Sequence, residues 1–360
     1  MLSYRHRLLL LLLLMAQGGQ AAEEAGSIDE LRSRAQQGDQ GAQEELADAY
    51  KKGRGVKKDT QEAEKWAALA AEQGSASAAY IAGVQYYFGS ATTPANHEKA
   101  LEWFTRAAEL GHAQAARELA VMHFGGLGCP KDDDKALAYG RQANMPEDAM
   151  LQNLLGFICL SAKDGRPRDA AGAYRHTLAA AQLGHADAQE RLARLYEQGI
   201  GAEENPAESL HWLRQAAANG HPAAMNKLAI LHMEGTALPK DEQAAAQLFR
   251  RAAEAGHADA QFNMARLCNE GSAGPKDTAA TEHWLRRAAE QGHTRAQMAL
   301  ITLLQQSSPD KQEEALQWLY RLGMHLYSTG HTEDGLNLLR QAAAAGSAEA
   351  IARLHELSAP

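Results

Sequence analysis

The chain has 360 residues, a formal net charge of −9 and 45% hydrophobic residues, of which few are aromatic. Ala, Leu, Glu, Gln and Arg are abundant, and no stretch alternates polar with apolar residues over the length of a buried strand. This composition predicts an all-helical protein. The acidic charge argues against phosphate-rich ligands, so we expect neither nucleic acid nor an anionic membrane as a partner.

Residues 1–21 have the pattern of a secretory signal peptide. A basic start precedes an apolar run at residues 8–16 that is too short to span a bilayer. Gly19 and Ala21 supply the small-x-small pattern for cleavage after Ala21, which lowers the formal charge from −9 to −11. No nearby Cys can accept a lipid, and an uncleaved interfacial anchor is disfavoured by the short run. We expect a periplasmic or secreted protein without a stable membrane span.

Glycine recurs with a period of about 36 residues from residue 35 onward. A second glycine falls inside each period, so each repeat contains two helices that end in the left-handed conformation that glycine favours. The glycines that close the repeats are Gly38, Gly74, Gly111, Gly184, Gly220, Gly256 and Gly292. The period predicts an α-solenoid of antiparallel helical hairpins.

The first helix of most repeats carries a large apolar residue followed by a small one, as in Leu119-Ala120, and the small residue lets a neighbouring helix approach closely. Four residues later comes a position on the same helical face. We expect burial between repeats at this position, which holds Tyr50, Tyr86, His123, Cys159, Tyr196, His232 and Cys268. The second helix carries a bulky residue eight positions before the closing glycine, namely Trp66, Trp103, Trp212, Leu248 and Trp284.

These features make the chain resemble the Sel1-like repeat proteins, relatives of the tetratricopeptide-repeat family with a longer turn between the two helices. The resemblance is carried by segments such as KALEWFTRAAELGHAQAA (99–116) and AAAQLFRRAAEAGHADAQ (244–261). We assign residues 35–310 to about eight such repeats. The resemblance implies a right-handed superhelix whose first helices line its concave face. Repeat four has His176 in place of Trp, and there we expect a local distortion rather than a domain boundary.

The two ends of the repeat array have a different character. Residues 22–34 are expected to form an N-terminal helix or linker, and residues 311–360 resemble a plain tetratricopeptide unit with a tight turn at Gly330 and a capping helix. Residues 311–329 fit either the second helix of repeat eight or the first helix of the next. A final helix over residues 348–357 is expected to cover the open apolar face, as terminal repeats must.

One histidine per repeat directly follows a closing glycine. Stacked helices lie about 8–10 Å apart, whereas two nitrogens on one zinc ion lie only about 3–4 Å apart. We therefore predict a structural role in the turn between repeats, and neither a metal nor a cofactor. These residues are His112, His185, His221, His257 and His293.

The chain contains three cysteines. Cys159 and Cys268 are three repeats apart, beyond the Cα separation of about 7 Å that a disulfide tolerates. Cys129, in the turn of repeat three, and Cys159, on the first helix of repeat four, are the one pair that could form a disulfide. Otherwise Cys159 and Cys268 act as small buried apolar residues.

The sequence offers little support for catalysis. It contains no phosphate-binding loop, dinucleotide fingerprint or nucleophile elbow. Some Sel1-like relatives are described as β-lactamase-like or penicillin-binding, so a hydrolase remains an alternative. The one Ser-x-x-Lys match runs from Ser308 to Lys311, contains Pro309, and lacks the accompanying Ser-Asp-Asn and Lys-Thr-Gly motifs. We predict no enzyme activity.

A partner-binding surface is expected where first-helix side chains project away from the seam between repeats. Aromatic, Arg and Asn side chains on a preformed surface suit a peptide or a partner helix. We predict a non-enzymatic scaffold or adaptor in the bacterial envelope that binds a protein partner. A glycan- or peptidoglycan-binding module is the other alternative, and several of these side chains could instead be packed by neighbouring helices. The residues are Tyr80, Tyr87, Phe124, Asn153, Phe157, Arg194, Asn226, Met233, Phe262, Arg266 and Asn269.

Overall fold

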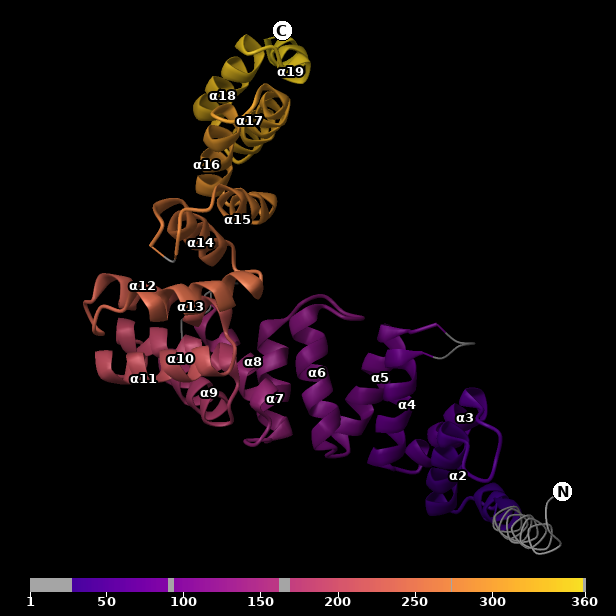
Figure 1. The fold of residues 1–360 in the computed structure, drawn as a ribbon. Coiled ribbons are helices and arrows are strands. Elements are labelled where there is room, and N and C mark those ends of the chain that lie inside the picture. The colour runs from indigo at the N-terminus through magenta and orange to yellow at the C-terminus, as the bar shows by residue number, and fades with distance from the viewer. Residues whose placement is uncertain (1–27, 90–93, 162–168, 273, 359–360) are drawn as a thin grey trace, which may run out of the picture. The chain divides into compact units, whose positions relative to one another are not determined.

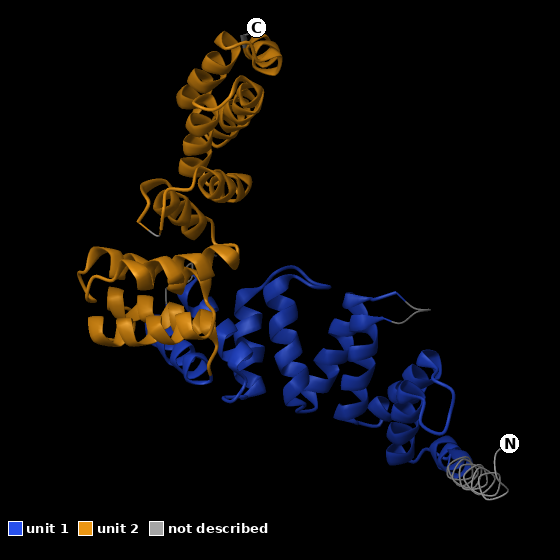
Figure 2. Ribbon diagram, in the orientation of Figure 1, with its two compact units in different colours: residues 1–183 blue, residues 184–360 orange. Residues whose placement is uncertain are grey.

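The computed structural model describes residues 28–89, 94–161, 169–272 and 274–358, and every regular element in these ranges is helical (Figure 1). The all-α class is thus confirmed. Contacts between residues divide the chain into two compact units, residues 1–183 and 184–360 (Figure 2). The predicted signal peptide lies outside the described residues, whereas the segment predicted as a helix or linker is helical from residue 28.

The first unit is a stack of antiparallel helical hairpins, preceded by a short helix at residues 28–36. Within each hairpin the two helices pack more extensively against each other than against the next hairpin. The described pairs are α2 (Gln40–Lys52) with α3 (Thr60–Glu72), α4 (Ala76–Phe88) with α5 (His97–Glu109), α6 (Ala113–Gly125) with α7 (Asp133–Ala143), and α8 (Ala149–Leu160) with α9 (Ala170–Gln182).

The second unit begins with the same arrangement. Its hairpins are α10 (Ala186–Gln198) with α11 (Pro206–Ala218), α12 (Pro222–Glu234) with α13 (Glu242–Glu254), and α14 (Ala258–Glu270) with α15 (Thr278–Glu290). These pairs and those of the first unit confirm the tandem hairpins that the glycine period predicted. After them come α16 (Thr294–Gln305), the short 3₁₀ helix η2 (Pro309–Lys311), α17 (Gln312–Ser328), α18 (Thr332–Ala344) and α19 (Ala348–Ser358).

The contacts of helix α17 show to which hairpin residues 311–329 belong, a question that the sequence left open. It packs against both α16 and α18, and most extensively against α18. Gly330, with φ of +93°, forms the tight turn between α17 and α18. Residues 312–328 are therefore the first helix of the last hairpin. The expected final helix is present as α19, which packs on α18.

The row of histidines begins the first helices of successive hairpins. The Nδ1 atoms of His112, His221, His257 and His293 each accept a hydrogen bond from the backbone N–H three residues later, at 3.0–3.3 Å. His185 makes no such cap. Four of the five thus have the predicted structural role. Across the described ranges, no cluster of three or more His, Cys, Asp or Glu side chains could hold a metal ion.

These caps should make the stability of the protein sensitive to acid. Burial lowers the pKa of His112 and of His257, and an Nδ1 that gains a proton can no longer accept the backbone hydrogen bond. The unfolded chain therefore binds protons first as the pH falls. The stabilisation should be complete above the ordinary His pKa of about 6.5 and should be lost progressively below it.

We predict that His257→Asn, which keeps a capping side chain but does not titrate, reduces the loss of stability between about pH 7 and pH 5. Urea unfolding at several pH values measures this loss. His211→Asn, on the exposed face of α11, is the matched control and should keep the wild-type pH dependence. An equal effect of the two substitutions would contradict the prediction.

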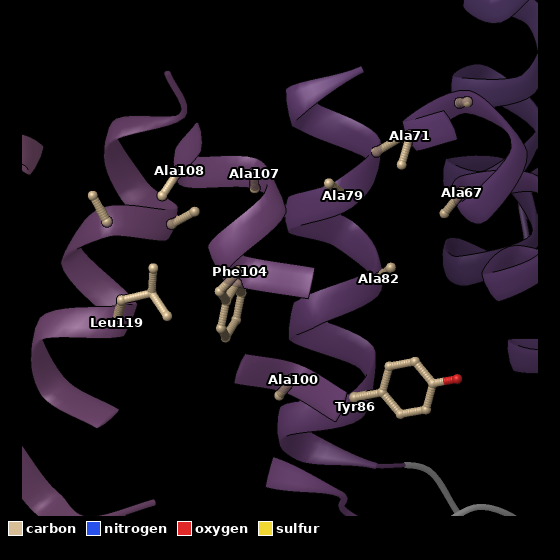
Figure 3. Close-up of a cluster of buried hydrophobic side chains, with 14 of the residues drawn as sticks. Ala67, Ala71, Ala79, Ala82, Tyr86, Ala100, Phe104, Ala107, Ala108 and Leu119 are labelled. Atoms are coloured by element: carbon tan, nitrogen blue, oxygen red, sulfur yellow. The ribbon is translucent and has the colours of Figure 1, made fainter. Parts of the chain in front are cut away.

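The core consists mainly of alanines with a few large residues among them, such as Phe104 and Leu119 (Figure 3). In the second helix of a hairpin, the most buried position lies seven residues before the closing glycine. This is one residue after the bulky position that the sequence indicated. Phe104 is 1% exposed, whereas the preceding Trp103 is only half-buried. A Cβ atom on Gly83 would lie 2.5 Å from the Phe104 ring. The close approach that the small residue was expected to permit is therefore present.

The fourth hairpin departs from this pattern of core packing. Thr177 takes the deep position, fully buried, and packs against Gly156, whose added Cβ would lie 2.6 Å from the Thr177 hydroxyl. Nδ1 of His176 instead lies 2.8 Å from the side-chain oxygen of Gln152. The division between the two units falls directly after this hairpin, between Leu183 and Gly184.

The disulfide that the sequence allowed between Cys129 and Cys159 is not formed, since both residues carry thiols. The Cys129 sulfur lies 3.4 Å from Nδ1 of His123, and burial raises the pKa of this thiol. Burial also lowers the pKa of His123. Both directions favour a neutral thiol beside a neutral imidazole, so this pair has a structural character and is not an activated nucleophile.

Candidate functional site

A groove of about 340 Å³ lies in the second unit, bounded by α14 and α16 with α15 beneath. Phe262, Arg266 and Asn269 line one wall, and their spacing of four and three residues places them on one face of α14. Three of the predicted partner-binding residues therefore meet in one groove. The opposite wall consists of Ala299, Thr302 and Leu303 from α16 and of Gln306, the residue directly after this helix.

The base of the groove is closed by packed side chains. Leu285 of α15 is 4% exposed, and Ala265 of α14 is 1% exposed. Thr281, also buried, donates its hydroxyl hydrogen to the backbone carbonyl of Asp277 at 2.7 Å, so its polar atom is satisfied within the fold. The base is thus apolar and already formed, as is usual for sites that bind side chains of a ligand.

Phe262 is held in position by contacts on two sides. Its ring stacks on that of His293, with 5.0 Å between the centroids and 24° between the planes. The Arg295 guanidinium lies 5.7 Å from the centre of the same ring, within reach of a cation–π interaction. His293 is itself held by its capping bond and by Asp259, whose carboxylate lies 3.0 Å from Nε2. Phe262 is therefore a preorganised aromatic wall.

Arg266 and Asn269 supply hydrogen-bonding capacity beside this wall. Both side chains are exposed, and neither has a hydrogen-bond or ion-pair partner in the part of the chain that the structure describes. A guanidinium offers several donors to carbonyl or carboxylate oxygens, and an amide offers both a donor and an acceptor. The groove thus combines an apolar base, a fixed aromatic ring and two available polar groups.

The other predicted residues of the second unit have different surroundings. Arg194, on α10, forms an ion pair with Glu190 at 3.0 Å. Asn226 is only 8% exposed, and its side-chain oxygen accepts a hydrogen bond from Asn263 at 3.1 Å, which ties α12 to α14. Met233 packs partly buried against the core of the second unit. The groove does not include these three residues.

Two predicted residues of the first unit are packed by their neighbours. Tyr80 and Tyr87 lie against Phe104, with ring centroids 5.7 and 6.4 Å away. Tyr80 also stacks on His112 at 4.4 Å, and burial raises the pKa of its hydroxyl. These tyrosines support the core of the first unit, which is the alternative that the sequence left open for them.

A second aromatic pair in the first unit is more accessible. Phe124 and Phe157 meet edge to face, with centroids 5.7 Å apart, and Phe157 is 46% exposed. The Lys131 ammonium lies 4.5 Å from the centre of the Phe124 ring. Asn153 lies half-buried on the same helix as Phe157. These residues form a surface on adjacent helices, α6 and α8, rather than a hollow.

The Ser-x-x-Lys match does not have the arrangement of a nucleophile and its base. The Lys311 ammonium pairs with the Glu282 carboxylate at 2.6 Å. The Ser308 hydroxyl hydrogen-bonds to Asp310, which lowers the pKa of that carboxyl group. Each side chain thus has a partner other than its counterpart in the motif.

Sequence reasoning missed a polar contact that recurs between hairpins. The Gln261 amide donates to the carbonyl of Ala253 at 3.1 Å, and Gln291 donates to the Gln261 side-chain oxygen at 2.8 Å. Gln43 and Gln297 make the corresponding contact to earlier carbonyls. The signal was a glutamine four residues after a helix cap, a position that the apolar period does not distinguish.

Gln261→Leu should lower the free energy of unfolding by about 1–3 kcal/mol, because it removes both the buried hydrogen bond to the Ala253 carbonyl and the one accepted from Gln291. Urea unfolding measures the change. Gln247→Leu on the exposed side of α13 is the control, for which we expect less than about 0.5 kcal/mol. If both variants match the wild type, this contact does not stabilise the array.

Comparisons with known proteins agree with this architecture. The model of the Sel1 repeat matches residues 41–75, 76–112, 113–145, 149–185, 186–221, 222–257, 258–293 and 319–347. The last match spans the hairpin of α17 and α18. A search of curated proteins finds no match. No helix in the described ranges is both long and apolar enough to cross a membrane.

Two solved structures are similar over most of the chain. One is c5321, a protective antigen of uropathogenic Escherichia coli strains with an SLR fold, at 29% identity and a TM-score of 0.66, covering 90% of this chain and 73% of that one. The other is a Sel1 repeat protein from Oxalobacter formigenes, at 27% identity and a TM-score of 0.63, covering 92% of this chain and 90% of that one.

Proposed function

Because the chain belongs to the Sel1 repeat family, whose fold commonly mediates contacts between proteins, we propose that it is a non-enzymatic scaffold that binds a protein partner in the groove between α14 and α16. The observation that carries the proposal is the meeting of Phe262, Arg266 and Asn269 over a closed apolar base. An aromatic anchor beside an unpaired Arg is typical of the side chains that dominate binding energy at protein interfaces.

The shape and chemistry of the groove suit one or two side chains of a partner helix or peptide. An apolar side chain would lie between Phe262 and Leu303, over buried Leu285. Its backbone carbonyl or a neighbouring carboxylate would accept from Arg266, and the Asn269 amide would pair with a peptide group. The volume of about 340 Å³ is near the lower end of the usual range for a ligand site, which favours a local anchor over a whole small molecule.

The bacterial envelope is the proposed location of this activity. The support is the basic start and short apolar run within residues 1–21. Expression of the full chain followed by separation of periplasm and cytoplasm tests the location. N-terminal sequencing of the recovered protein should place the new terminus at Ala22, and a cytoplasmic protein that keeps Met1 would exclude the proposal.

Site-specific photo-cross-linking in cells tests the groove itself. A photo-reactive benzoylphenylalanine in place of Leu303, inside the groove, should give a discrete adduct with a protein that mass spectrometry identifies. The same probe in place of Met298, which is 47% exposed on α16 but does not line the groove, is the matched control. Equal labelling from both positions would contradict a groove-specific partner.

The same preparations separate the alternatives. Turnover of nitrocefin by the purified mature protein above a heat-killed control would favour the hydrolase alternative. Sedimentation with purified cell wall that is unaffected by Phe262→Ala would favour a glycan-binding module on another surface. We expect neither result.

A further inference from the structure

The first unit contains a second hollow, with different chemistry. It measures about 970 Å³ and lies between the end of α2, the turn into α3 and the end of α4. Four lysines line it, Lys51 and Lys52 from α2 and Lys57 and Lys58 from the turn, with Asp59 as the one carboxylate among the lining residues. Such a local concentration of positive charge is unusual in a chain whose formal charge is −9.

Most of this positive charge is not neutralised within the fold. Lys52 and Arg54 both pair with Asp48. Lys51, Lys57 and Lys58 have no ion-pair partner among the described residues. The Asp59 side chain accepts hydrogen bonds from the backbone N–H groups of Gln61 and Glu62 as the cap of α3, so its charge is directed to the helix start. The hollow therefore presents three lysines to a ligand.

Lys51 is the most enclosed of these lysines. It is half-buried, and burial lowers the pKa of its ammonium group. A partly desolvated ammonium gains more from an anionic partner than a fully hydrated one does, because the effective dielectric around it is lower. An anion in the hollow would restore the charged form that burial disfavours.

One wall of the hollow contains a buried amide without partners. Gln85 is 9% exposed, and neither its side-chain nitrogen nor its oxygen makes a hydrogen bond. In other hairpins the corresponding position is apolar and buried, as in Met122, Ile158, Leu195 and Leu267. An unpaired buried amide is a cost to the fold. Its donor and acceptor together match those of a peptide group.

The remaining wall is apolar. Val84 and Phe88 of α4 line the hollow, and Phe88 is 76% exposed, the largest exposed fraction among the bulky hydrophobic residues described. The combination of unpaired lysines, an amide and an apolar wall is more than phosphate recognition needs. Nucleic acid and anionic lipid would also meet long-range repulsion from the acidic chain.

We propose that this hollow binds an acidic peptide segment of a protein partner, with carboxylates on Lys51, Lys57 and Lys58 and an apolar side chain on Phe88. The inference rests on the proposed scaffold role, because only a scaffold of this kind has a protein partner to bind. It uses a different unit from the α14–α16 groove, so the substitutions that test one site leave the other intact.

Fluorescence anisotropy with the full-length mature protein tests the proposal. The probe is a fluorescein-labelled peptide of about ten residues in which Asp and Glu flank a central Leu. We expect binding that weakens at least about ten-fold when NaCl is raised from about 50 to about 500 mM, because screening shortens the range of the lysine charges. A peptide with Asn and Gln in place of the acids should not bind, and equal binding of the two peptides would overturn the proposal.

Two triple variants with equal net charge locate the site. Lys51→Gln/Lys57→Gln/Lys58→Gln should weaken binding at least about ten-fold, because three unpaired charges are removed from the hollow. Lys135→Gln/Lys240→Gln/Lys276→Gln removes exposed lysines elsewhere and should change affinity by less than about two-fold. Equal losses in the two variants would show general charge attraction and would overturn the proposal, as would tighter binding of a polyphosphate than of the peptide.

Gln85→Leu separates a role in binding from a role in stability, because the two properties should change in opposite directions. It should raise the urea midpoint of unfolding, because an apolar side chain replaces an unpaired buried amide, and it should weaken binding of the acidic peptide. Higher stability with unchanged affinity would remove Gln85 from the site. Self-association that occupies the hollow, detected by light scattering and abolished by the first triple variant, would replace the acidic partner with a second copy of the chain.

Discussion

Replacing Phe104 with Ala is expected to lower the free energy of unfolding of the first unit by about 3–5 kcal/mol. The ring is 1% exposed and lies against Gly83, Tyr80 and Tyr87. Its removal leaves a cavity that the neighbouring alanines cannot fill, because their methyl groups have no alternative rotamer that could reach into it (Figure 3). Urea unfolding followed by circular dichroism measures the loss.

Phe88→Ala is the matched control for this prediction. It deletes the same atoms from the same pair of helices, but its ring is 76% exposed, so we expect a loss below about 0.5 kcal/mol. Repeat arrays can lose hairpins one at a time, so the transition of Phe104→Ala should also broaden. A loss of similar size in both variants would show that the packing between α4 and α5 is not the main source of stability.

The second large effect is expected in the groove of the second unit. Phe262→Ala/Arg266→Ala/Asn269→Ala should weaken binding of the cross-linked partner by about a hundred-fold or more, which corresponds to about 3 kcal/mol. Phe262 supplies the apolar wall, and Arg266 and Asn269 supply the polar contacts that have no partner within the described chain. Titration calorimetry with the purified partner measures the change.

A control triple on α13 has similar chemistry outside the groove. Gln247→Ala/Leu248→Ala/Arg250→Ala removes an amide, a half-buried apolar side chain and an exposed Arg. Its affinity should stay within about two-fold of the wild type, and both triples should keep the helical circular dichroism spectrum. If the control weakens binding as much as the groove variant, the partner does not recognise the wall of α14.

The glycine period was sufficient to predict the hairpins, because the glycines of the period have positive φ and lie just after helix ends. It could not identify the deepest core position. Trp103 and Phe104 are adjacent and both bulky, and which ring lies against Gly83 depends on the rotation of α5. Helix α17 was ambiguous for a related reason, since Gly323 lies within it and packs against Leu339 without ending the helix.

The groove was predicted on one wall only. Phe262, Arg266 and Asn269 follow from spacing along one helix, whereas Thr302 and Leu303 belong to the next repeat, from which no partner-binding residue was predicted. Asn226 has the same position within its repeat as Phe262. It is nevertheless buried, and it accepts a hydrogen bond from Asn263 of the next hairpin. Contacts between hairpins, which one repeat alone does not encode, decide which first-helix residues are available.

Hydrogen–deuterium exchange of the mature protein, with and without its cross-linked partner, tests the central claim most directly. Partner binding in the groove should slow exchange in the peptides of α14 and α16, while α11 and α13 exchange as they do in the free protein. The same slowing should be absent in Phe262→Ala/Arg266→Ala/Asn269→Ala. Slowing confined to α11 and α13 would contradict the groove as the partner site. So would slowing of α14 and α16 that is as large in this variant as in the wild type.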